Sequence, residues 1–164
     1  MTPESFFQHE LLSGEIEVPL ILPVGIAWSP YEQALLWLSR CLNTHSDCVT
    51  GASSAAKRNP SRLLDISTSS QDVRLCRPDP TPFLKYGALS HRWEADDQLR
   101  LLSTTIDSFL DSIPMSLLSG TFQEAIAARR ELNIRYIWID SLCILQDSKD
   151  GLAQESSRMG EVYQ

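Results

Sequence analysis

The stretch RYIWIDSLCILQD at residues 135–147 constrains the fold of this chain more than any other. Its first half, Tyr136 to Ile139, is continuously apolar, as expected of a strand covered on both faces of a sheet. Polar and reactive side chains follow directly, among them Asp140, Ser141, Cys143 and Asp147. A buried strand that leads into such a cluster indicates an α/β sheet with a site outside the carboxyl end of the strand.

The neighbouring patterns predict that strands and helices alternate along this part of the chain. Residues 84–92 and 135–140 are expected as strands, and residues 121–132 as a helix that begins at a capping box at Thr121. A last helix is expected from about residue 149. This order predicts a parallel sheet in which the two strands are neighbours and the first helix packs against them.

The same pattern predicts which side chains the sheet and helix bury. We expect four of them to be largely inaccessible: Tyr136, Trp138, Ile126 and Leu132. Arg129 and Arg130 are expected at the solvent edge of the helix, and Asn133 as a left-handed residue that ends it.

Residues 1–83 predict a leader of separate elements, distinct from residues 84–164. A capping box at Ser29 with Pro30 and Glu32 begins a helix over about 30–42. A linker rich in small residues and a short hairpin follow, at 50–61 and 62–76 respectively.

Composition excludes several classes of protein. The chain has 21 acidic and 14 basic side chains and a net charge of −7, which argues against nucleic acid as the partner. The apolar stretch Val18 to Trp28 is broken by Pro23 and Gly25 and is too short to span a membrane. Without a secretory signal, the four cysteines are expected as thiols of a cytoplasmic protein.

The short spacing of Cys41, His45 and Cys48 could indicate a zinc site. Structural zinc takes four ligands, and no fourth ligand is evident except the distant Cys76. We therefore expect no metal.

The two predicted strands of residues 84–92 and 135–140 both become polar at their carboxyl ends, which lie at one edge of a parallel sheet. We expect a single crevice to gather these side chains: Ser90, His91, Arg92, Trp93, Asp140, Ser141 and Asp147.

Three of these residues, and Cys143 beside them, also have a structural interpretation. Asp140 can equally hold a loop through backbone N–H groups, and Ser90 lacks a base that would make it a nucleophile. Cys143 is interpreted as a core residue rather than a catalytic thiol paired with His91. Trp93 is more typical of packing than of ligand stacking.

Glu155 is the best carboxylate for stabilising a developing oxocarbenium charge, because its position in the last helix is close to the face that carries Met159. The alternative, a solvated helix glutamate, is favoured.

Four segments resemble the heterokaryon incompatibility (HET) domain of filamentous fungi over about residues 86–163: YGALSHRWE, TFQEAI, IRYIWIDSLCILQD and ESSRMGEVY. The chain departs from the family pattern at His91, at Glu94 and at Gly151. Glu94 replaces a glycine, which is expected to alter the loop after the first strand. Because HET domains continue further, the resemblance implies a truncated copy that is inactive and poorly stable alone.

The resemblance implies a signalling module of non-self recognition and regulated cell death that works through protein partners or self-association. It also implies an incomplete three-layer parallel-sheet domain similar to Toll/interleukin-1 receptor (TIR) or flavodoxin-like folds. Some TIR domains cleave NAD with a glutamate, which leaves a TIR-like NAD glycohydrolase as the alternative, with NAD as substrate, Glu155 as catalytic residue and no bound cofactor. No phosphate-cradling glycine loop supports the enzyme.

Overall fold

The computed structural model describes residues 29–46, 58–67, 72–93 and 99–163. The chain divides into two compact units, Met1–Ala55 and Ala56–Gln164. Within the described residues, no helix combines the length and the apolar character needed to cross a membrane.

The first unit contributes helix α2, Pro30–Thr44, which confirms the helix predicted at about 30–42. Ser29 and Glu32 form the predicted capping box, in which the Glu32 N–H donates to Ser29 Oγ and Glu32 Oε2 accepts from the Ser29 N–H. These two bonds satisfy N–H groups that the first turn leaves free. Residues 50–57 of the predicted linker lie outside the described residues.

The second unit is built on a four-stranded sheet of order β2-β1-β4-β3. Its strands are β1 (Leu63–Asp65), β2 (Arg74–Cys76), β3 (Tyr86–Leu89) and β4 (Tyr136–Ile139). β3 and β4 are parallel and in register from Tyr86 opposite Tyr136 to Leu89 opposite Ile139. The predicted pairing of these two strands is confirmed.

The sheet is mixed, so the expected all-parallel arrangement is wrong. β1 is antiparallel to β2, as predicted for a hairpin, and it is also antiparallel to β4. The hairpin is therefore part of the same sheet as β3 and β4. Because β3 occupies one side of β4, the hairpin supplies the hydrogen-bonding partner that the other side of β4 needs.

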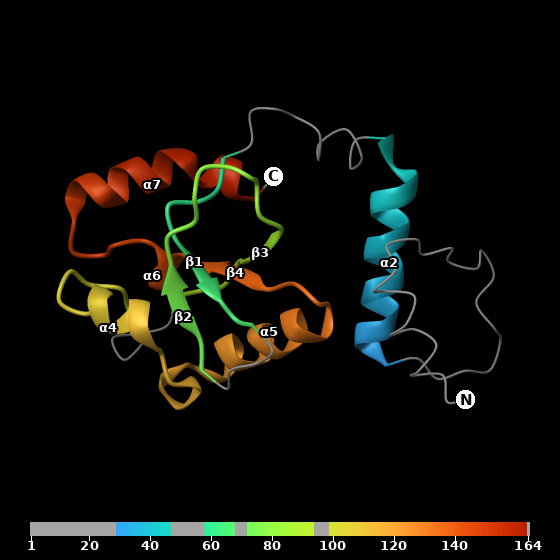
Figure 1. Cartoon of the computed structure of the whole chain (residues 1–164), viewed down its shortest axis with the longest axis horizontal. Helices are drawn as coiled ribbons and strands as arrows, with labels where there is room; N and C mark the ends of the chain where they lie inside the picture. The colour runs from blue at the N-terminus through green and yellow to red at the C-terminus, as the bar shows by residue number, and fades with distance from the viewer. Residues whose placement is uncertain (1–28, 47–57, 68–71, 94–98, 164) are drawn as a thin grey trace. The chain divides into compact units, whose positions relative to one another are not determined.

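Helices cover both faces of the parallel pair (Figure 1). Helix α5, Gly120–Glu131, packs on β3 at Gly87, where the absence of a side chain makes room for the guanidinium of Arg129. Helix α7, Lys149–Val162, approaches the other face, where the Tyr86 hydroxyl donates to the Val162 carbonyl at 3.0 Å. Since Tyr86 and Gly87 are consecutive strand residues, they point to opposite faces.

Two details of α5 differ from the sequence-based expectation. The helix is capped by Ser119, whose Oγ accepts from the Phe122 N–H, and not by Thr121. Arg129 is half-buried over Gly87 rather than at the solvent edge. Asn133 has φ 52°, which confirms the predicted left-handed residue after this helix.

Three shorter helices complete the unit: α4 (Ile106–Asp111), the 3₁₀ turn η1 (Met115–Leu117) and α6 (Asp140–Cys143). The last of these begins immediately after β4, so the polar cluster follows the strand end, as predicted, and forms a short helix there.

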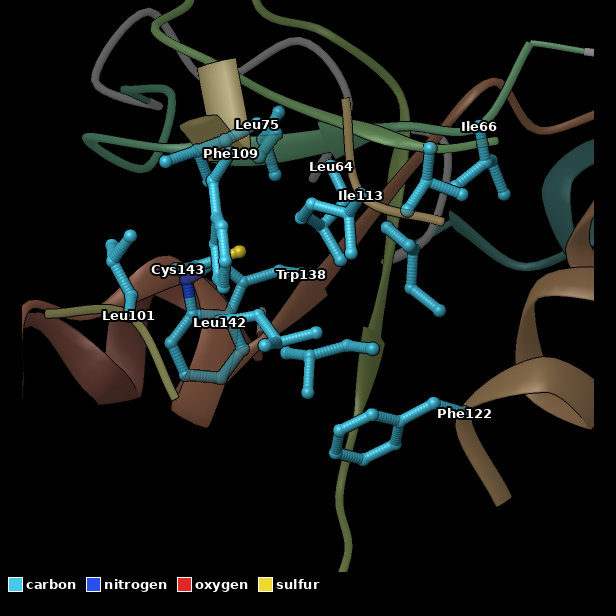
Figure 2. Close-up of a cluster of buried hydrophobic side chains, with 14 of the residues drawn as sticks. Leu64, Ile66, Leu75, Leu101, Phe109, Ile113, Phe122, Trp138, Leu142 and Cys143 are labelled. Carbon is cyan, nitrogen blue, oxygen red and sulfur yellow. The ribbon is translucent and has the colours of Figure 1, made fainter. Parts of the chain in front are cut away.

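The core of the unit lies between the sheet and these helices (Figure 2). Trp138 is 1% exposed and Ile126 is fully buried, as predicted. Tyr136 and Leu132 are only half-buried, because Tyr136 begins β4 and Leu132 follows the last residue of α5. Residues at element ends are packed from fewer sides than residues at their centres.

Candidate functional site

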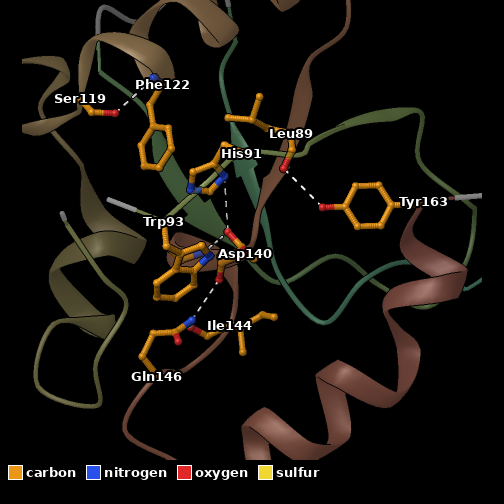
Figure 3. Close-up of polar contacts among 10 residues, drawn as sticks. Leu89, His91, Trp93, Ser119, Phe122, Asp140, Ile144, Gln146 and Tyr163 are labelled. Carbon is orange, nitrogen blue, oxygen red and sulfur yellow. Dashed lines mark hydrogen bonds and ion pairs between the residues drawn. The ribbon is translucent and has the colours of Figure 1, made fainter. Parts of the chain in front are cut away.

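The candidate site lies where β3 and β4 end side by side. Leu89 and Ile139 are paired at this edge of the sheet. The chain after β3 carries His91 and Trp93 to the edge, and β4 leads directly into Asp140 (Figure 3). Parallel pairing thus brings together side chains that are almost fifty residues apart in the sequence, at the edge that the sequence predicted.

The carboxylate of Asp140 is the centre of the cluster. Trp93 Nε1 donates to its Oδ2 at 2.6 Å, and the Ser141 N–H donates to its Oδ1 at 2.7 Å. His91 Nδ1 lies 3.7 Å from Oδ1 and forms an ion pair with it when the imidazole is protonated. Asp140 therefore ties the segment after β3 to the start of α6.

The ring of His91 is held by packing as well as by Asp140. It meets the ring of Phe122 edge-on at 4.9 Å between centroids and 88° between planes. The His91 side chain is 6% exposed. Because Phe122 lies in the first turn of α5, this contact joins the segment after β3 to helix α5.

Trp93 is the accessible aromatic side chain of the cluster. It is 39% exposed, and the guanidinium of Arg100 lies 5.7 Å from its ring centroid. The choice between packing and ligand stacking for Trp93 stays a prediction. Its bond to Asp140 fixes the indole while part of the ring stays exposed.

Gln146, which was not among the predicted site residues, holds the backbone turn that follows β4. Gln146 Nε2 donates to the carbonyls of Asp140 at 3.1 Å and Ile144 at 2.9 Å. The backbone of Leu101 bridges the same turn, since it donates to Ser141 O and accepts from the Gln146 N–H. These bonds satisfy buried backbone groups and hold Asp140 in place.

Tyr163, just after α7, is a further residue that sequence reasoning did not assign to the site. Its hydroxyl donates to the Leu89 carbonyl at 3.4 Å, and its ring lies edge-on to Trp138 at 5.7 Å. Burial, followed by the charge of Asp140, raises the pKa of Tyr163, so the hydroxyl remains a donor. A tyrosine placed after the end of a helix gave no local signal of this contact.

Several predicted residues lie apart from the Asp140 cluster. Asp147 accepts from both the N–H and the Oγ of Ser103, and these bonds lower its pKa. Ser141 is fully buried in α6, so its hydroxyl does not line an open crevice. Ser90 and Arg92 are exposed beside the cluster. The loop predicted to be altered at Glu94 lies outside the described residues.

Cys143 is a core residue, as predicted. It is 1% exposed, and burial raises the pKa of its thiol to about 12. The thiolate that acts as a nucleophile is therefore scarcely populated at neutral pH.

Glu155, the predicted catalytic residue, is buried in α7 at 6% exposure. The favoured interpretation as a solvated helix residue is therefore wrong. Among the described residues, no hydrogen bond or ion pair joins Glu155 to Asp140.

The described residues contain no group of three His, Cys, Asp or Glu side chains placed to hold a metal ion. Cys41 and His45 both belong to this part of the chain, whereas Cys48 lies outside it.

Residues 86–164 match the family model described as "Heterokaryon incompatibility protein (HET)". No curated protein and no solved structure matches the chain. The matched residues contain β3, α5, β4, α6 and α7, and with them the whole Asp140 cluster.

Proposed function

Because residues 86–164 belong to the heterokaryon incompatibility (HET) family, we propose that this chain is a signalling module of fungal non-self recognition that triggers regulated cell death. The family match is the observation that carries the proposal, and it supports a function of the heterokaryon incompatibility type in general. We place the protein in the cytoplasm, where such a module would meet its partners.

The partners of such a module are proteins, including further copies of the chain. The surface beside Asp140 supports this assignment because it presents two large aromatic side chains, Trp93 at 39% and Tyr163 at 46% exposure. Tryptophan and tyrosine are enriched among the residues that carry most of the binding energy of protein interfaces. Asp140 would hold Trp93 in the orientation that the partner meets.

Cell death in a filamentous fungus tests the proposal. The chain is expressed as a fusion to a ligand-inducible dimerisation domain, and growth arrest and uptake of a vital dye are scored after induction. The isolated chain is expected to be inactive, so arrest is expected only when the induced fusion brings copies of the unchanged chain together. Arrest should be lost with Asp140→Asn, which removes the negative charge at the cluster. Asp111→Asn, at the exposed end of α4, is the matched control and should leave arrest intact.

Two outcomes would contradict this function. Induced fusions that leave growth unaffected would remove the signalling role. Equal loss of arrest in the Asp140 and Asp111 variants would remove the assignment of the site, provided that both proteins accumulate to the same level.

A second candidate function, NAD cleavage by a TIR-like mechanism, is supported by the burial of Glu155. A buried carboxylate can stabilise the positive charge that develops when a glycosidic bond breaks. NAD is then a substrate. This candidate requires, against the expectation that the chain is inactive alone, that the purified chain releases nicotinamide. The release should be abolished by Glu155→Gln and retained by Glu124→Gln on the surface of α5. Absence of release from the unchanged chain would refute this candidate.

A further inference from the structure

A pocket of about 290 Å³ lies beside the amino end of β4, at the end of the strand away from Asp140. Its charged lining comes from the hairpin, from the segment after β2 and from the residue before β4: Asp65, Arg74, Arg77, Asp79 and Arg135. Pro78, Pro82 and Tyr136 contribute apolar wall. Nothing in the proposed signalling role uses this pocket.

One carboxylate of the pocket is already neutralised. Asp65 is 5% exposed and accepts from Arg135 Nε at 3.0 Å and Arg135 Nη2 at 2.8 Å. Arg74 Nη2 donates to the same carboxylate at 3.3 Å. The hydrogen bonds from Arg135 are the main reason that the pKa of Asp65 lies below its usual range.

The arginines retain donors that Asp65 does not use. Each guanidinium carries five N–H groups, and Asp65 takes two from Arg135 and one from Arg74. Both side chains are more than half exposed, at 56% and 58%. Arg77 lines the pocket and makes no hydrogen bond or ion pair with any residue that the structure describes.

The balance of charge in the pocket is positive although the chain as a whole carries −7. Three arginines face two carboxylates, and Asp65 is already engaged. Arg77, together with the spare N–H groups of Arg74 and Arg135, can meet a planar or tetrahedral anion with several donors at once. The apolar wall beside them suits the carbon skeleton of a small molecule.

We propose that this pocket binds a small molecule bearing a phosphate or carboxylate group, held by Arg77, Arg74 and Arg135. The pocket binds its ligand without covalent chemistry. Its thiol, Cys76, is half-buried, and burial followed by the charge of Asp65 raises its pKa. The neutral thiol is a poor nucleophile.

Calorimetric titration of the full chain at constant ionic strength tests the proposal. Inorganic pyrophosphate and tricarballylate are the two probes, and the tighter one identifies phosphate or carboxylate as the recognised group. Saturable binding of at least one probe is expected. Arg77→Gln should weaken it about tenfold, the loss typical of one charged hydrogen bond.

Two further variants make the test specific to the pocket. Asp79→Asn removes a carboxylate from the lining and should strengthen binding of the same probe. Arg40→Gln, at an exposed position of α2, removes one positive charge, as Arg77→Gln does, and should leave the affinity for the probe unchanged. Arg74 and Arg135 are not substituted, because their loss would leave the buried carboxylate of Asp65 without its ion-pair partners.

The proposal is overturned if neither probe shows saturable binding. It is also overturned if Arg77→Gln and Arg40→Gln weaken binding equally, since the effect would then be one of net charge alone. An unchanged affinity for Asp79→Asn would place the anion outside this pocket. Circular dichroism of each variant confirms that the fold is retained.

Discussion

Truncation of Trp138 to alanine should remove the largest single packing contribution of the second unit. Trp138 lies in β4 at 1% exposure, and its ring meets Tyr163 edge-on at 5.7 Å. β4 is the strand that joins the hairpin to β3. A cavity at this position therefore affects both halves of the sheet.

The magnitude follows from the buried area. A tryptophan buries about 150–250 Å², which corresponds to about 4–6 kcal/mol at about 25 cal/mol per Å². The unfolded chain already hides part of this area, so the true value is smaller. We expect Trp138→Ala to lower the free energy of unfolding by about 3–5 kcal/mol, as large aromatic truncations in cores do.

Equilibrium unfolding in urea, followed by far-ultraviolet circular dichroism, measures this loss without relying on tryptophan fluorescence. Trp37→Ala is the control, because Trp37 is 63% exposed on α2 and its truncation should cost less than about 0.5 kcal/mol. A loss below about 1 kcal/mol for Trp138→Ala would show that this ring is not packed in the core as described.

Three further predictions concern a carboxylate, two glycines and a thiol. Because its arginine partners hold the pKa of Asp65 below the usual value of 3.8, Asp65 stabilises the fold at neutral pH, and this contribution is lost as the pH falls below that value. The urea midpoint should therefore fall less between pH 7 and pH 2 in Asp65→Asn than in the unchanged chain, and equal falls in the two proteins would contradict this. Gly87→Ala places a methyl group against the Arg129 guanidinium and should lower the free energy of unfolding by about 1–3 kcal/mol. Gly160→Ala, whose new methyl group has nothing within 4 Å, should raise it by about 0.5–1 kcal/mol, and melting temperatures that shift in the same direction for both variants would refute the packing of α5 on β3. Because its thiol is buried and has a raised pKa, Cys143 should resist iodoacetamide at pH 8 in the folded chain and react in urea, which mass spectrometry of the labelled peptides measures. Labelling of Cys143 in the folded protein would mean that α6 opens.

Elements with a strong local pattern could be predicted from the sequence. The apolar run of residues 136–139 forms β4, and the capping box at Ser29 begins α2. The hairpin and the parallel pairing of β3 with β4 were also predicted correctly. The individual strands and helices depend on side-chain periodicity and capping, which are properties of short segments. The pairing of β3 with β4 joins distant segments, but it follows from the general handedness rule for a strand–helix–strand connection.

The location of the candidate site was predictable for the same reason, although its contacts were not. Asp140 and His91 follow the ends of parallel neighbours, and such ends meet at one edge of a sheet. Asp147, equally polar and nearby in sequence, instead binds Ser103. The partner of a polar side chain depends on which distant segment the fold brings beside it.

The remaining features depend on contacts between segments that are distant in the sequence. β1 pairs with β4 because β3 occupies only one side of β4 and the backbone groups on the other side need partners. Arg129 lies over Gly87, and Arg135 turns to Asp65, for the same kind of reason. Periodicity assigns a residue to one face of its own helix or strand, and it carries no information about the surface that this face will meet. The assembled sheet and its helices supply that second surface, and with it the arginine-lined pocket and the burial of Glu155.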